Sequence, residues 1–120
     1  MMSKAIMDTQ IDGKNTLYFS GKFAGYNYKI KKVNGLENLK KMMNAATVDL
    51  GLGRVEKIES KGNNILIKIT GEFGPENHFV TGLITGLVSK SLDYNFYKFT
   101  GREIKSRNKG KKYLFEIKSI

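Results

Sequence analysis

The clearest pattern in the chain is a stretch from Leu36 to Leu50 in which apolar residues recur every three or four positions. Leu39 and Ala46 take part in this repeat, which places apolar side chains on one side of an α-helix. Gly51 follows directly, and glycine is common just beyond a helix C-terminus. The pattern therefore predicts a helix with one buried face.

A period of two residues, which places alternate side chains on opposite faces, marks the strands. In the two best examples the apolar side is formed by Ile65, Ile67 and Ile69, and by Tyr113, Phe115 and Ile117. Segments 54–60 and 94–106 alternate less regularly, and Gly101 favours a bulge or a bend in the second. The links SKGNN and RNKGK have the glycine and asparagine typical of hairpin turns. Two β-hairpins are expected.

Between the hairpins, segment 76–92 is apolar over most of a helical circumference, yet it contains Gly82 and Gly86. Each glycine costs a helix interior roughly 1 kcal/mol relative to alanine. Positions four apart lie on the same face, so the two glycines form a groove. A neighbouring helix, the sheet, a partner subunit or a flat ligand could fill it. Close helix packing within the domain is the simplest of these interpretations.

The N-terminal part has weaker signals. Residues 1–13 are expected to form a loose lead-in, and residues 14–120 a single domain. Segment 16–21 is β-prone and ends in glycine, whereas 22–33 has apolar residues at helical intervals. The whole pattern predicts an α+β fold in which helices cover an antiparallel sheet of two hairpins.

Composition limits the possible chemistry of this 120-residue chain. It has no cysteine and a single histidine, His78, so thiolate metal sites and disulfides are excluded and a zinc site is not expected. No pair of carboxylates has spacing suited to acid–base catalysis, and no apolar run has the roughly 20 residues needed to cross a bilayer. The expectation is a cytoplasmic, non-catalytic domain without a metal or cofactor.

The segments HFVTGLITGLVSKSL and GREIKSRNKGKKYLFEI together resemble the signature of the 4-vinyl reductase-type domain, named after bacteriochlorophyll 4-vinyl reductase. The resemblance extends over about residues 16 to 118. The matching positions are His78, Gly82 and Gly86 in the helix, Glu103, and Gly110 and Phe115 in the closing hairpin, together with Gly51 and Gly53 before the first hairpin. Where that family has two cysteines, this chain has Ser106 and either Tyr113 or Leu114.

The resemblance implies a domain that binds a small hydrophobic molecule, often in sensory proteins, and that is distantly similar to subunits of the TRAPP vesicle-tethering particle. It also implies a homodimer. Apolar walls with a few polar groups are typical of such sites. The predicted ligand pocket consists of His78, Phe79, Gly82, Leu83, Gly86, Leu87, Tyr97 and Glu103. Two further tyrosines, Tyr26 and Tyr28, are candidate polar groups, although the aromatic residues could equally fill the core.

The charge of the chain suggests an alternative function. Its 21 lysines and arginines exceed its 11 acidic residues, which gives a net charge of +10. A cluster in the predicted C-terminal hairpin contains Lys98, Arg102, Lys105, Arg107, Lys109, Lys111 and Lys112. Such a hairpin could bind a nucleic-acid backbone, with Tyr97 and Phe99 stacking on bases. A solvated edge that discourages strand-to-strand aggregation is the competing interpretation.

Overall fold

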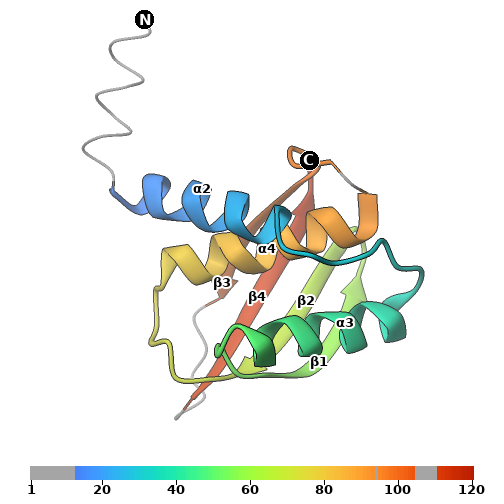
Figure 1. The fold of residues 1–120 in the computed structure, drawn as a ribbon, viewed down its shortest axis with the longest axis horizontal. Coiled ribbons are helices and arrows are strands. Elements are labelled where there is room, and N and C mark those ends of the chain that lie inside the picture. The colour runs from blue at the N-terminus through green and yellow to red at the C-terminus, as the bar shows by residue number, and fades with distance from the viewer. Residues whose placement is uncertain (1–12, 94, 105–110) are drawn as a thin grey trace, which may run out of the picture.

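A computed structural model describes residues 13–93, 95–104 and 111–120 (Figure 1). Its elements are α2 (Gly13–Tyr26), α3 (Leu36–Asp49), β1 (Arg54–Lys61), β2 (Asn64–Thr70), α4 (His78–Asp93), β3 (Phe99–Ile104) and β4 (Lys112–Ser119). The strands form one antiparallel sheet in the order β1-β2-β4-β3. The predicted α+β fold, with two hairpins covered by helices, is confirmed.

The core lies between the sheet and the helices on one of its faces. Ile67 of β2 is opposite Ile58 of β1 and Phe115 of β4, and both Ile67 and Phe115 are fully buried. Helix α3 packs against β1, and α4 packs against β3 and β4 (Figure 1). The buried face of α3 includes Leu39 and Met43, as its periodicity predicts.

The glycines of α4 allow α2 to pack directly on its backbone. The four glycines at this contact are Gly21 and Gly25 from α2 and Gly82 and Gly86 from α4. A Cβ atom on Gly82 would overlap the carbonyl oxygen of Tyr18, and one on Gly86 would overlap that of Lys22. Helix α4 is consequently enclosed between the sheet and α2, so the contact is close helix packing within the domain.

Two predictions for the N-terminal part differ from the structure. Segment 16–21 is not a strand, and the helix expected over 22–33 ends at Tyr26, because one continuous helix, α2, occupies this region. Its packing on α4 overrides the local β-propensity of the aromatic and β-branched residues. The lead-in predicted for residues 1–13 lies outside the described residues except for Gly13, which begins α2.

The third strand also differs from the prediction. It begins at Phe99, since residues 95–98 form a turn, while Tyr94 and residues 105–106 lie outside the described part. Gly101 pairs regularly with Ile117 and forms no bulge; its missing side chain leaves room for Thr85 of α4. The irregular register lies instead between Val55 and Lys57 in β1.

Side chains of α2 cover the free edge of β3. Tyr18 accepts a hydrogen bond from the Gly101 amide at 3.0 Å, and Lys22 donates one to the Phe99 carbonyl at 2.6 Å. The Lys22 ammonium lies 4.7 Å from the centre of the Phe96 ring. Burial lowers the pKa of this lysine. The hydrogen bonds of Tyr18 and Lys22 connect α2 to β3. They also occupy backbone groups with which another strand could otherwise pair.

Candidate functional site

Part of the predicted ligand pocket lies in the core. The groove formed by Gly82 and Gly86 is filled by the backbone of α2. Leu83 is 5% exposed and Leu87 is fully buried, both within the main hydrophobic cluster. These four residues are together in space, but the contact between α2 and α4 occupies the room that a ligand would need between the two glycines.

The other predicted pocket residues lie near the two ends of α4. His78 and Phe79 begin the helix, and the Glu103 carboxylate accepts a hydrogen bond from the Glu76 amide at 3.1 Å, close to that end. Tyr97 lies in the turn after the helix, where its ring contacts Phe96, and it is 78% exposed. A helix of 16 residues is about 24 Å long, so His78 and Tyr97 do not line one cavity.

An open groove between α3 and the segment that precedes it, here called the α3 groove, has a volume of about 500 Å³. Its walls comprise Tyr28, Lys29, Ile30, Lys31, Val33, Met42, Ala45, Ala46 and Asp49. The Val33 amide donates a hydrogen bond to the Ser91 carbonyl at 2.9 Å, which anchors this wall to α4. Small-molecule sites usually measure about 300–1,000 Å³, so the groove is large enough for a ligand.

The hydrogen-bonded polar group of the α3 groove is a pair formed by Tyr28 and Asp49, and the exposed Lys29 and Lys31 lie beside it. The Tyr28 hydroxyl donates a hydrogen bond to the Asp49 carboxylate, and this bond raises the pKa of the tyrosine. Ile30, Val33 and Met42 pack against the core and give the groove its apolar floor. Sequence patterns singled out Tyr28 but not its partner, because Tyr28 and Asp49 are 21 positions apart.

The predicted basic hairpin is described only in part. Lys105, Arg107 and Lys109 lie outside the described residues. Arg102 pairs with Glu116 at 2.9 Å, and Lys111 pairs with Glu72. Lys112 lies 3.9 Å from Glu56, whereas Lys98 belongs to the turn before β3. The described part thus contains three cations that already have acidic partners.

The face of the sheet opposite the helices, here called the outer face, gathers more cations than the described part of the hairpin does. Most of its residues follow from the alternation and register of the strands, and Glu56, at the irregularity in β1, is placed there by its contact with Lys112. The cations are Arg54, Lys57, Lys61, Lys68, Arg102, Lys112 and Lys118, and the carboxylates are Glu56, Glu59 and Glu116. Five of these seven cations are absent from the predicted hairpin set, although their outward positions in the alternating strands could have revealed them.

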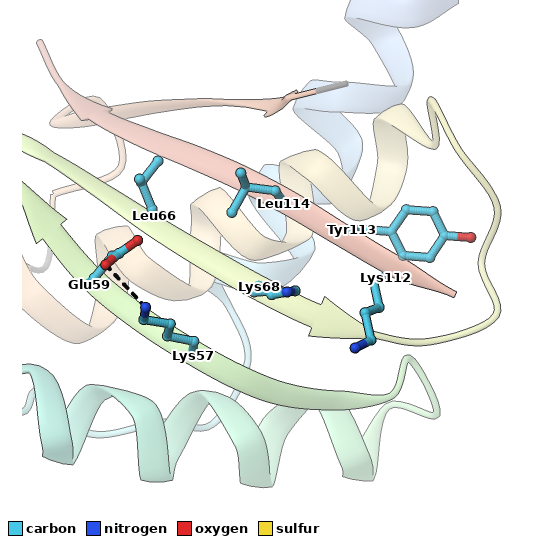
Figure 2. Close-up of a pocket in the computed structure, with 7 residues that line it drawn as sticks. All are labelled: Lys57, Glu59, Leu66, Lys68, Lys112, Tyr113 and Leu114. Carbon is cyan, nitrogen blue, oxygen red and sulfur yellow. Dashed lines mark ion pairs between the residues drawn. The ribbon is translucent and has the colours of Figure 1, made fainter. Parts of the chain in front are cut away.

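A shallow hollow of about 200 Å³ lies at the centre of the outer face. Figure 2 shows Lys57 and Glu59 from β1, Leu66 and Lys68 from β2, and Lys112, Tyr113 and Leu114 from β4 around it. Lys57 and Glu59 form an ion pair at 3.5 Å between well-exposed side chains. The hollow contains no residue of the predicted ligand pocket.

Other classes of site are not seen in residues 13–93, 95–104 and 111–120. No three of their histidine and acidic side chains come together in a way that could hold a metal ion. No helix among them has the length and apolar character needed to cross a membrane. Comparison of the chain with protein-family models and with curated proteins finds no match.

Proposed function

We propose that this protein is a domain of the 4-vinyl reductase type that binds a small hydrophobic molecule in the α3 groove without catalysing a reaction. The observation that carries the proposal is the combination of an apolar floor with one hydrogen-bonded polar pair, Tyr28 and Asp49. The apolar part of the ligand would contact Ile30, Val33 and Met42, and a polar group would bond to the tyrosine–aspartate pair.

The resemblance to 4-vinyl reductase-type domains supports the same class of ligand and extends the proposal. A sensory or regulatory role, a homodimer and a cytoplasmic location follow from that resemblance and from the absence of cysteine. The binding site differs from the one expected from the sequence, because α2 fills the groove between Gly82 and Gly86.

Native mass spectrometry of gently purified protein provides the first test, and titration with the uncharged apolar fluorescent dye Nile red provides the second. We expect a co-purifying small-molecule mass or saturable dye binding at one site per chain. Ala45 lines the groove and is exposed, so Ala45→Phe should fill the groove without disturbing the core. The variant should lose the added mass and weaken dye binding at least about tenfold, which is about 1.4 kcal/mol.

The matched control is Ala24→Phe, which adds the same ring to an exposed position of α2 away from the groove. This variant should keep the co-purifying mass and bind the dye with the same affinity as the unsubstituted protein. The proposal would be contradicted if the protein showed neither a co-purifying small-molecule mass nor saturable dye binding. It would also be contradicted if Ala45→Phe and Ala24→Phe bound the dye equally well.

A further inference from the structure

The outer face carries a charge arrangement that the fold does not require. In the pairing of β1 with β2, Lys57 is directly opposite Lys68, and like charges in such positions destabilise a sheet. Lys112 and Lys118 of β4 add cations on either side of Leu114 and Glu116. With seven cations against three carboxylates, the face has a net charge of +4.

Several of these cations are available to a partner. Ion pairs link Lys57 with Glu59 and Arg102 with Glu116, and Lys112 is near Glu56. In the described part of the chain, no salt bridge engages the remaining four, which are Arg54, Lys61, Lys68 and Lys118. They come from three strands, so they form a surface rather than a single row along one strand.

The shape of the face suits an extended anion. The central hollow includes Lys57, Lys68 and Lys112 (Figure 2), and a second hollow is lined by Arg102, Glu116 and Lys118 among others. The two hollows involve all four strands of the sheet. A chain of phosphates passing over both could contact successive cations, whereas one small anion would reach only a few.

We propose that the outer face binds the phosphate backbone of nucleic acid. Neutralising several phosphates and releasing their counterions would compensate for the unfavourable juxtaposition of Lys57 and Lys68. The interaction would be largely independent of base sequence, because Leu66 and Leu114 are the central uncharged groups of the face and neither can donate hydrogen bonds to base edges.

An anionic membrane fits the outer face less well. Proteins that bind at a membrane surface combine cations with apolar side chains that insert on the same side. The large apolar residues of the outer face are Leu66, Ile104 and Leu114, and all are partly buried. The strongly exposed ones, which include Phe23 and Tyr97 at 65% and 78%, belong to α2 and the turn before β3 instead.

The test measures binding of the full chain to a short fluorescein-labelled DNA duplex, and to one of its strands alone, over a series of salt concentrations. We expect binding that weakens steeply with salt. The double variant Lys68→Gln with Lys118→Gln should reduce the slope of log K against log salt by about 2, since each phosphate contact contributes about 0.9. At about 0.1 M salt its affinity for duplex should be lower by roughly 60-fold, by the same relation.

A control of equal charge change is Lys40→Gln with Lys41→Gln, two exposed positions of α3 on the helix side of the sheet. It should change the slope by much less. A second outer-face variant, Lys57→Gln with Lys61→Gln, repeats the test at two exposed positions. It should reduce the slope in the same way, so the proposal can still be tested if the first variant folds poorly.

Three outcomes would overturn the proposal: no salt-dependent binding to either DNA, equal slopes for the outer-face and α3 variants, or tighter binding to phosphatidylserine vesicles or polyglutamate than to DNA. Because the α3 groove shares no residue with the outer face, Ala45→Phe should leave DNA binding unchanged. The small-molecule proposal can therefore fail without affecting this one.

Discussion

The two faces of the sheet are made by the same strands and yet have opposite character. On the helix side, Ile67, Ile69 and Phe115 are fully buried, whereas their immediate neighbours in sequence, such as Lys68 and Glu116, point to the outer face. A one-residue slip in register would exchange the two sets. Burial on one face is enough to fix the register, which leaves the other face free to carry charge.

The difference between the two faces can be tested most directly with adjacent residues of β2. Ile67→Ala should lower the free energy of unfolding by about 2–5 kcal/mol, because it removes a fully buried side chain and leaves a cavity. Its control, Leu66→Ala on the outer face, should cost less than about 1 kcal/mol. Urea denaturation of both variants measures the difference, and equal losses would show that the outer face is also buried in solution.

The second prediction concerns the layer that covers the helix face. Gly86→Ala should destabilise the fold by about 1–3 kcal/mol through overpacking against the Lys22 carbonyl, even though alanine favours the helix itself. Ser20→Ala, at an exposed position of α2, should have little effect. Thermal unfolding followed by circular dichroism measures both. A more stable Gly86→Ala protein would contradict the close contact of α2 with α4.

The third prediction is a pH dependence that arises where α2 meets the edge of β3. Burial lowers the pKa of Lys22 below its ordinary value of 10.5, so the folded chain releases this proton before the unfolded chain does. Between the lowered pKa and 10.5 the unfolded state binds more protons, and the free energy of unfolding should rise with pH. Lys22→Met should remove this rise.

Urea denaturation at a series of alkaline pH values measures the effect of Lys22. The control is Lys40→Met on the exposed side of α3, which should keep the rise seen in the unsubstituted protein. If the difference between Lys22→Met and the unsubstituted protein is constant with pH, the lysine is not desolvated in the folded state.

The smallest expected effect is on the outer face. Hydrogen bonds from Arg102 and Asn64, together with nearby positive charge, lower the pKa of Glu116. The stability that Glu116 contributes is present above its ordinary pKa and is lost as pH falls through the lowered value. In Arg102→Gln the pKa of Glu116, followed by NMR titration, should rise toward the ordinary range.

Arg54→Gln is the control for the Glu116 titration, since Arg54 is paired at the far end of the face with Thr70. It should leave the pKa of Glu116 unchanged. An equal rise in both variants would mean that the general field of the outer face, rather than the contact with Arg102, sets this pKa.

Most of the α3 groove could not be predicted from sequence patterns. Tyr28 could be named as a polar candidate, but the α3 groove depends on where the segment after α2 crosses α3, which the hydrogen bond from Val33 to Ser91 fixes. The residues predicted to form a ligand pocket around α4 lie mostly on one helix in the sequence. In space, α2 covers part of that helix, and the ends of α4 are far apart.

Local sequence patterns predict four elements: α3, β2 and β4 from one strong periodicity each, and α4 from a segment that is apolar over most of a helical circumference. Burial of a single face selects the period of 3.6 in α3 and of 2 in β2 and β4, whereas α4 is buried nearly all round. The α+β class follows from the order of these elements. The formation of α2 and the gathering of charge on the outer face depend on tertiary contacts instead. Helix α2 forms because its glycines meet those of α4 and its Tyr18 and Lys22 reach β3, contacts between residues far apart in the chain. Likewise, only the pairing of three strands collects Lys57, Lys68 and Lys112 on one surface, because neighbours across a sheet are set by register and not by sequence distance.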